Sequence, residues 1–414
     1  MITFYPSTLE GNITIPSSKS YTHRFLIACA LTFYTTGTIS VFYHPLICED
    51  TFYTLIALRT LGFDIEYDNK KDAVTCKGFK KKEQNIHISC GESASTLRFL
   101  IPLSLYIYDK VEYSCKNQLF LKRGINGYYS FFKDNNINYL FNKDYSLLTL
   151  YKLDKEQQLI IPSTLDNLTS SQYITGLLFI MPMLNNQKIY FSDKIVSKSY
   201  VDITLDVLSS SKIKFEKNQN NITVYQSKYY LDPVSVEGDY SLAALYFCLN
   251  NINKDNNIKI LNLKEDSFQP DRRIVSLINQ IKEKENSIID IDDNIDLGPV
   301  LFMFAAIINT TTFINIERLK IKESNRLQEM MNIFNTLDIE YEYIPNKYFK
   351  VYKSIIQKCD EVFISTDHRI THALILLFSI YGGKIKDISN LEKSCPSLIF
   401  DLIKLKYHTI KNIE

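Results

Sequence analysis

One local pattern recurs along the chain and limits the fold more than any other feature. An apolar helix is followed by a polar break, an alternating strand, a turn of Asn, Asp or Lys, and a second strand. Four stretches show this pattern, and their strand cores begin near Ile65, Ile137, Ile213 and Ile339. The first two spacings are 72 and 76 residues, and the last interval leaves room for a further copy around 280–292. The spacing exceeds that of solenoid repeats and predicts repeated α/β units.

We expect an α/β (α+β) protein of about six βαβαββ units, with helices inside and sheets outside. A chain of 414 residues is too long for one typical core, so the units should be shared between two domains. No linker rich in Pro, Gly or Ser separates them, and the turn-rich EGDYS at 237–241 is the expected boundary.

Composition excludes some classes of function. The formal charge is +1, so no overall field for a polyanion is expected. Eight cysteines without a CxxC pair favour a reducing cytoplasm. Apolar runs stop at about a dozen residues, short of a membrane span. MITFYPSTLEGN has no basic residue, so no targeting peptide is expected.

Arginine is rare, with 9 residues against 38 lysines, and should mark sites that need a planar bidentate donor. PSSKSYTHR, residues 16–24, places Lys19, Ser20 and Arg24 at the start of an apolar helix. A helix N-terminus with these cations can bind an anion without glycines. An ordinary capped helix with solvated charges fits the motif equally well. Neither GxxxxGK[ST] nor GxGxxG occurs in the chain.

Further helix starts repeat this theme in the first half of the chain. CGESASTLRFL contains Ala94 and Arg98, and LKRGI contains Arg123. TSSQYITGLL supplies Ser170, Ser171 and Gln172, whereas VSKSYVDITL supplies Ser197 and Tyr200. Hydroxyl and amide groups there can hold a phosphate, although each motif alone is more often a simple cap.

Candidates for acid–base chemistry lie in the second half. IKESNRL should place Lys322, Glu323 and Arg326 in one helical turn, with the two cations on one face. A surface ion-pair network is the alternative. Asp296 precedes the apolar helix GPVLFMFAAII, where a partly desolvated carboxylate can act as a base or simply cap the helix.

TDHRITHAL places His368 and His372 four residues apart, as a metal pair would be. Arg369 lies between them and no cysteine or carboxylate completes a ligand set, so no metal site is expected. LEKSCPSL adds Lys393 at another expected helix start, where a solvated lysine is the alternative.

Together and in order, ten stretches from PSSKSYTHR to KSCP resemble the 5-enolpyruvylshikimate-3-phosphate (EPSP) synthase family. The resemblance implies a two-domain inside-out α/β barrel with three βαβαββ units in each domain. One domain would comprise 1–17 and 238–414, and the other 18–237. The substrates would bind at the interface between the domains, which would close on them.

The resemblance also implies two sets of binding residues, which overlap. Shikimate 3-phosphate would be bound by Lys19, Ser20, Arg24, Ser170, Ser171, Gln172, Ser197, Tyr200, Asp296 and Lys322. Phosphoenolpyruvate would be bound by Lys19, Ala94, Arg123, Gln172, Glu323, Arg326, Arg369 and Lys393.

In the mechanism that the family implies, Asp296 takes the proton of the 5-hydroxyl as that oxygen attacks C2 of phosphoenolpyruvate. Glu323, assisted by Lys19, protonates C3, and the tetrahedral ketal then loses phosphate. Electrostatic preorganisation would be the main catalytic contribution, so no metal or other cofactor is expected. The enzyme would be a cytoplasmic monomer of chorismate and aromatic amino-acid biosynthesis, with no nucleic-acid or membrane partner.

Two departures from the family pattern stand out. Ala94 occupies a position where most relatives have glycine, beside the expected phosphoenolpyruvate pocket. Its methyl group should crowd the bulkier analogue glyphosate and reduce sensitivity to it. Gly124 stands where many relatives have proline.

Three alternatives remain at this stage. The sister transferase that acts on UDP-N-acetylglucosamine normally uses a loop cysteine and has Lys-Asn where this chain has Lys19 and Ser20. Cys115 lies in the strand-like segment VEYSC and is interpreted as a packed thiol. RNA 3′-phosphate cyclases share related units but need a nucleotide site, and a polyanion-binding module should show steep salt dependence.

Overall fold

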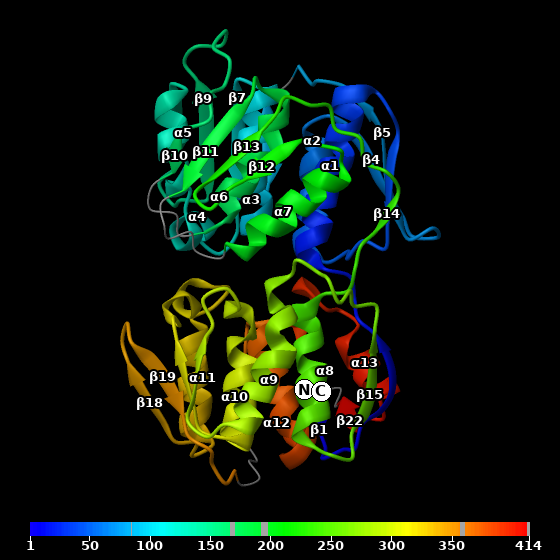
Figure 1. The fold of residues 1–414 in the computed structure, drawn as a ribbon, viewed down its shortest axis with the longest axis vertical. Helices are drawn as coiled ribbons and strands as arrows, with labels where there is room; N and C mark the ends of the chain where they lie inside the picture. The colour runs from blue at the N-terminus through cyan, green and yellow to red at the C-terminus, as the bar shows by residue number, and fades with distance from the viewer. Residues whose placement is uncertain (84, 166–169, 192–197, 357–360, 412–414) are drawn as a thin grey trace. The chain divides into compact units, whose positions relative to one another are not determined.

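The structure is a computed structural model. It describes residues 1–83, 85–165, 170–191, 198–356 and 361–411. The chain divides into two compact units (Figure 1). The N-terminal unit is the continuous stretch Ser17–Val236, and the C-terminal unit combines Met1–Pro16 with Glu237–Glu414.

Described strands of the N-terminal unit form three four-stranded sheets of one topology, ordered β14-β3-β5-β4, β6-β7-β9-β8 and β10-β11-β13-β12. In each sheet the first two strands are parallel and the remaining pairs are antiparallel. The strands are β3 (Ser40–Tyr43), β4 (Phe63–Asp68), β5 (Ala73–Phe79), β6 (Ile86–Ser89), β7 (Lys110–Ser114), β8 (Ile137–Phe141), β9 (Leu147–Lys152), β10 (Thr164–Leu165), β11 (Gln187–Phe191), β12 (Phe215–Lys217), β13 (Asn221–Val224) and β14 (Val234–Ser235).

The helices of this unit are α1 (Lys19–Thr36), α2 (Glu49–Thr60), α3 (Ala94–Ile107), α4 (Leu119–Arg123), α5 (Tyr129–Asp134), α6 (Gln172–Ile180) and α7 (Ser199–Ser210), with short 3-10 turns η1 (Asn126–Tyr128) and η2 (Met181–Met183). Helices α1, α3 and α6 are buried over most of their length. The sheets face them with alternate side chains, as in β4, where Phe63 and Ile65 are buried and Asp64 and Glu66 are exposed. Each fully buried large apolar side chain stabilises the unit by about 1.5–3 kcal/mol.

In the C-terminal unit, described strands form four-stranded sheets ordered β16-β17-β19-β18 and β20-β21-β1-β22, and the pair β15-β2. The first sheet has the same one parallel and two antiparallel pairings. The strands are β1 (Ile2–Phe4), β2 (Glu10–Thr14), β15 (Asn257–Leu261), β16 (Ser287–Asp290), β17 (Thr311–Ile314), β18 (Tyr341–Ile344), β19 (Tyr348–Val351), β20 (Val362–Phe363), β21 (Gly383–Ile385) and β22 (Thr409–Lys411).

The helices here are α8 (Tyr240–Ile252), α9 (Ile274–Glu283), α10 (Gly298–Ile308), α11 (Arg326–Thr336), α12 (His368–Tyr381) and α13 (Leu398–Lys404), with 3-10 turns η3 (Pro270–Arg273), η4 (Ile295–Leu297), η5 (Glu317–Ile321) and η6 (Ser389–Lys393). Helices α8, α10 and α12 pack against one another in the interior (Figure 1). Helix α10 is buried from Gly298 to Ala306 because its sequence, GPVLFMFAAII, is apolar on all sides. Among the described residues, no helix has both the length and the apolar character that a membrane span requires.

The expected α/β fold built from βαβαββ units is confirmed, with small shifts of strand boundaries. Strands near Ile65 and Ile137 are β4 and β8, and the further copy expected around 280–292 contains β16. The other two strands begin later than predicted, at Phe215 and Tyr341. The residues expected to open these strands are still bonded to the preceding helices, because the backbone N–H of Ile213 donates to the carbonyl oxygen of Leu208 at 2.9 Å and that of Ile339 to the carbonyl oxygen of Phe334 at 2.9 Å.

Candidate active site

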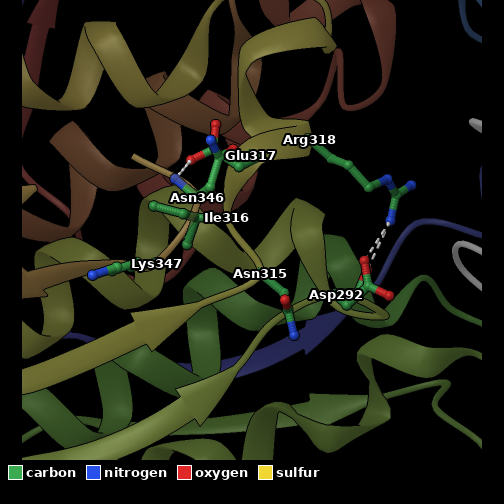
Figure 2. A pocket seen from close by; sticks show the side chains of 7 residues that line it. All are labelled: Asp292, Asn315, Ile316, Glu317, Arg318, Asn346 and Lys347. Atoms are coloured by element: carbon green, nitrogen blue, oxygen red, sulfur yellow. Dashed lines mark hydrogen bonds and ion pairs between the residues drawn. The ribbon is translucent and has the colours of Figure 1, made fainter. Parts of the chain in front are cut away.

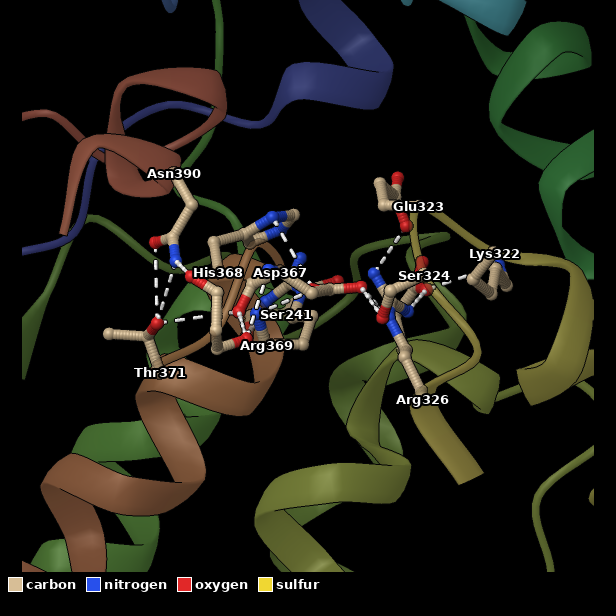
Figure 3. Close-up of polar contacts among 12 residues, drawn as sticks. Ser241, Lys322, Glu323, Ser324, Arg326, Asp367, His368, Arg369, Thr371 and Asn390 are labelled. Atoms are coloured by element: carbon tan, nitrogen blue, oxygen red, sulfur yellow. Dashed lines mark hydrogen bonds and ion pairs between the residues drawn. The ribbon is translucent and has the colours of Figure 1, made fainter. Parts of the chain in front are cut away.

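The buried guanidinium of Arg326 is the centre of a charged group in the C-terminal unit. Its side chain is 1% exposed and reaches three carboxylates. Nε donates to Oδ2 of Asp367 at 2.7 Å, and Nη1 donates to Oδ1 of Asp296 at 2.6 Å. Nη2 donates to Oε2 of Glu323 at 2.5 Å (Figure 3). Together with Lys322 and Arg369, these residues are called the C-terminal cluster.

Ends of interior helices place these side chains. Asp296 lies in η4, immediately before α10, and Asp367 is the N-cap of α12, where its Oδ1 accepts from the backbone N–H of Arg369 at 2.9 Å. Arg326 is the first residue of α11, which Asn325 caps by accepting from the backbone N–H of Gln328. Charged groups at helix starts therefore converge from different elements of one unit.

The predicted helical turn through 322–326 is wrong. Helix α11 begins only at Arg326, so Lys322 and Glu323 lie in the segment between η5 and α11. Asn325 provides the reason, since its side chain caps the helix and starts it after Glu323. Lys322 and Arg326 nevertheless meet at one atom, because Nζ of Lys322 lies 3.1 Å from the same Oδ1 of Asp296.

Burial and charge act in opposite directions on these groups. Burial raises the pKa of Asp296, but Lys322 and Arg326 outweigh it and hold that pKa well below its usual value. Burial lowers the pKa of Lys322 to about 8, although Asp296 opposes this. Burial also disfavours charged Arg326, yet its carboxylate partners, Asp367 first, raise its pKa well above the usual value. Asp296 is therefore ionised at neutral pH.

Arg369 lies beside this centre with its hydrogen-bonding capacity only partly used. It is 7% exposed, and its Nη1 donates to the carbonyl oxygen of Ser241 at 2.6 Å (Figure 3). Among the described residues, none offers an acceptor to the buried Nε. A buried N–H of this kind is costly unless a ligand pairs with it.

The remaining candidates of the C-terminal unit are Lys393 and the two histidines of α12. Lys393 is the last residue of η6, five positions before α13, so its predicted place at a helix start is wrong. His368 and His372 are buried with ring centroids 6.1 Å apart, and burial lowers the pKa of His372 well below its usual value. Within the described ranges, no group of three or more His, Cys, Asp or Glu side chains is arranged to hold a metal ion.

In the N-terminal unit, Arg24 is buried in the second turn of α1 and is held by neutral groups. Nε donates to Oγ1 of Thr204 at 2.8 Å, and Nη1 donates to the carbonyl oxygen of Ser20 at 2.7 Å. Nη2 donates to the carbonyl oxygen of Tyr200 at 3.1 Å. Burial lowers the pKa of Arg24 to about 10. At the start of the same helix, Nζ of Lys19 lies 3.0 Å from Oδ2 of Asp50.

Arg98, to which the sequence assigned no ligand, lies close to other candidates. Its Nη1 donates to Oε1 of Gln172 at 2.9 Å, and Nε2 of Gln172 donates to Oγ of Ser95 at 2.9 Å. Its guanidinium carbon lies 4.5 Å from the ring centroid of Tyr173. Burial lowers its pKa to about 10. The scarcity of arginine was the one signal that could have pointed to it.

The other candidates of this unit occupy the starts or ends of helices. Ser170 accepts from the backbone N–H of Gln172 at 3.3 Å, and Ser171 is the N-cap of α6. Tyr200 lies in the first turn of α7, whereas Arg123 ends α4. Ala94 begins α3 and is 2% exposed. Ser197 lies outside the described residues. Lys19, Ser20, Arg24, Ala94, Arg98, Gln172 and Tyr200 are called the N-terminal cluster.

A separate pocket of about 220 Å³ opens where β16 and β17 end in the C-terminal unit (Figure 2). Charged side chains of Arg318 and Glu317 pair with groups of the pocket's own wall. Nη1 of Arg318 donates to the carbonyl oxygen of Asp292 at 2.8 Å, and Oε1 of Glu317 accepts from the backbone N–H of Asn346 at 2.7 Å. These contacts give the lining a structural role.

The family assignment rests on a match over nearly the whole chain. Residues 5–402 match the family model described as EPSP synthase (3-phosphoshikimate 1-carboxyvinyltransferase). The chain belongs to the EPSP synthase family. It is thus an enzyme, a transferase of the shikimate pathway, and the family's members act on shikimate 3-phosphate and phosphoenolpyruvate.

Curated relatives and solved structures agree with this assignment. The 3-phosphoshikimate 1-carboxyvinyltransferase of Clostridioides difficile is 31% identical, with 96% of this chain and 95% of the relative covered. That of Clostridium kluyveri is 33% identical over 82% of this chain and 81% of the relative. The fold is similar to EPSP synthase from Acinetobacter baumannii, with a TM-score of 0.80, 18% identity and 99% of both chains covered. It is also similar to the enolpyruvyl transferase NikO from Streptomyces tendae, with a TM-score of 0.73, 13% identity and coverage of 99% and 98%.

Proposed function

We propose that the two clusters together transfer the enolpyruvyl group of phosphoenolpyruvate to the 5-hydroxyl of shikimate 3-phosphate, with release of phosphate. In this proposal the N-terminal and C-terminal units are the enzyme's two domains. Each cluster provides only part of the set that the reaction requires, so residues of both units act on the same pair of substrates.

Shikimate 3-phosphate is assigned mainly to the N-terminal cluster. Arg24 is buried among neutral acceptors, so an anionic substrate would supply the negative charge that its described partners lack. Ser20, Gln172 and Tyr200 lie in the first turns of α1, α6 and α7, respectively, and supply neutral hydrogen-bonding groups. The binding set also includes Ser170, Ser171, Ser197, Lys322 and Asp296.

Phosphoenolpyruvate is assigned to cations of both units. Arg369 is the strongest candidate, because its buried Nε lacks an acceptor among the described residues. Arg326 is already held by three carboxylates and would contribute positive charge in a fixed place. Lys19, Arg123 and Lys393 complete the cations, with Ala94 and Gln172 in the wall.

The acid–base assignment rests on one observation, that Asp296 and Glu323 share the guanidinium of Arg326. Lys322 and Arg326 keep Asp296 ionised, so it can accept the proton of the 5-hydroxyl as that oxygen attacks C2. Glu323, assisted by Lys19, donates a proton to C3. In the second step the C–O bond to phosphate breaks and a methyl proton returns to the same acid–base set. The fixed cations stabilise the anionic ketal between these steps.

A cytoplasmic, monomeric enzyme is part of the proposal. Seven cysteines in the described ranges are free thiols, which supports a reducing compartment.

The decisive experiment measures phosphate release from phosphoenolpyruvate with and without shikimate 3-phosphate. Release that requires shikimate 3-phosphate, together with a new enolpyruvyl ether detected by mass spectrometry, is the expected result. Release that instead requires UDP-N-acetylglucosamine would overturn the proposal in favour of the sister reaction.

A further inference from the structure

Asp271 is a buried carboxylate to which the proposed mechanism assigns no role. It lies in η3 and is 1% exposed. Burial raises its pKa to about 6, and the charge of Asp296 acts in the same direction, whereas Ser241, Arg369 and Asn294 oppose it. The stretch SFQPDRR has neither the alternation of a strand nor an apolar helix behind it, so the sequence did not single it out. A buried acid kept near the acid–base centre calls for an explanation.

One oxygen of Asp271 leads to Arg369. Oδ2 of Asp271 accepts from the hydroxyl of Ser241, and the carbonyl oxygen of Ser241 accepts from Nη1 of Arg369 at 2.6 Å. Ser241 lies in the first turn of α8, so this bond fixes the start of that helix against η3. Nη1 is held in this way, whereas Nε has no acceptor among the described residues and is left to pair with a ligand.

The other oxygen leads to Asp296. Oδ1 of Asp271 accepts from Nδ2 of Asn294 at 3.3 Å, and the same nitrogen donates to the carbonyl oxygen of Pro270 at 2.7 Å. Asn294 precedes η4, and its own carbonyl oxygen accepts from the backbone N–H of Leu297 at 2.9 Å. Asp296 lies inside this turn, so the position of its carboxylate depends on how Asn294 is held.

We propose that Asp271 is a positioning residue that orients Arg369 through Ser241 and the turn of Asp296 through Asn294. This inference rests on the proposed function of those two residues. Asp271 itself touches neither substrate. Through its two oxygens, the buried side chain of Asp271 links Arg369, which is assigned to phosphoenolpyruvate, to Asp296, which is assigned to proton transfer.

The test compares Asp271→Ala with Ser241→Ala in steady-state kinetics. Ser241→Ala removes the first path alone and should raise KM for phosphoenolpyruvate about tenfold, the effect of one hydrogen bond to a charged group, with kcat nearly unchanged. Asp271→Ala removes both oxygens, so it breaks both paths and should raise the same KM and also lower kcat. In the double variant KM should be no higher than in Asp271→Ala, because both changes break the path through Ser241.

Two controls separate positioning from general damage. Ser287→Ala removes another buried hydroxyl of the C-terminal unit, one that is hydrogen-bonded to Thr311, and should leave KM for phosphoenolpyruvate unchanged. Melting curves of all variants show whether the fold is retained. KM for shikimate 3-phosphate should change less than twofold in Ser241→Ala.

Two outcomes would overturn the inference. One is a wild-type KM for phosphoenolpyruvate in folded Asp271→Ala, and the other is a double variant whose KM increases by the product of the single effects. Failure of the proposed function is a different result, because the wild-type enzyme itself would then release no phosphate with shikimate 3-phosphate.

Discussion

Two buried arginines, one in each unit, show opposite electrostatic designs. Arg326 in the C-terminal unit has three carboxylate partners, and its pKa is raised well above the usual value. Arg24 in the N-terminal unit has hydroxyl and carbonyl partners among the described residues, and burial lowers its pKa to about 10. Both side chains are at most 2% exposed, so burial alone does not explain the difference.

The difference separates two tasks. A cation that is already neutralised by carboxylates stabilises their ionised forms and fixes acid–base groups in place. A cation held by neutral groups retains its attraction for an anion and keeps its geometry when the anion arrives. Arg98, with Gln172 and the ring of Tyr173 around it, follows the second design.

The largest expected effect tests the acid–base role of the C-terminal cluster. Asp296→Asn keeps the side-chain shape but removes the charge, and we expect kcat to fall by about 10²–10⁴-fold, the usual contribution of one general base. Stopped-time phosphate release assays measure this loss. A kcat near that of the wild type would mean that the C-terminal cluster is only a structural ion-pair network.

The next effect tests the neutral surroundings of Arg24. Arg24→Lys removes the planar fork, and KM for shikimate 3-phosphate should rise by about 10–100-fold because one ammonium cannot replace several directed donors. Arg59→Lys is the matched control, since Arg59 also donates to a backbone carbonyl, that of Ile65, in the same unit. Equal kinetics for the two variants would contradict the proposed role of Arg24.

A smaller effect concerns the wall of the N-terminal cluster. Ala94→Gly removes one buried methyl group at the start of α3, and the inhibition constant of glyphosate should fall about tenfold. KM for phosphoenolpyruvate should change less, because the smaller substrate already fits. Inhibition assays with phosphoenolpyruvate as the varied substrate measure both values. An inhibition constant in the wild-type enzyme as low as that of a sensitive relative would refute the expectation.

The smallest effect is a shift along the pH axis. The pKa of Lys322 is lowered to about 8, so its charge disappears as the pH rises through that value. The charged form of Lys322 neutralises Asp296 and is assigned to the binding of shikimate 3-phosphate. The value of kcat/KM for shikimate 3-phosphate should therefore fall above about pH 8. In Lys322→Arg this decline should move to higher pH, since arginine stays protonated. If the fall in kcat/KM occurs at the same pH in Lys322→Arg, a group other than Lys322 causes it.

The repeated units and the starts of the site helices could be predicted because their signals are local. The alternation of apolar and polar residues predicted β4 and β8. The polar motifs before apolar runs predicted the starts of α1, α6 and α12. The pairing of β2 with β15 could not be predicted, because the partners are more than 200 positions apart and no local pattern encodes it.

The motifs of the sequence named the candidate residues but could not predict the contacts that these residues make. A helical turn was expected to bring Lys322 and Arg326 together, whereas a cap at Asn325 leaves one outside the helix and both still reach Asp296. Asp271 was missed because its partners, Ser241 and Asn294, are brought to it only by tertiary folding.

Strand β1 has an antiparallel neighbour on each side, β21 and β22, both from the end of the chain. During synthesis, residues 17–236 emerge as one uninterrupted stretch and can fold as soon as they leave the ribosome. Strand β1 must wait for hundreds of residues before its partners exist. A variant that lacks β22 would therefore leave β1 with an open edge, a known starting point for aggregation.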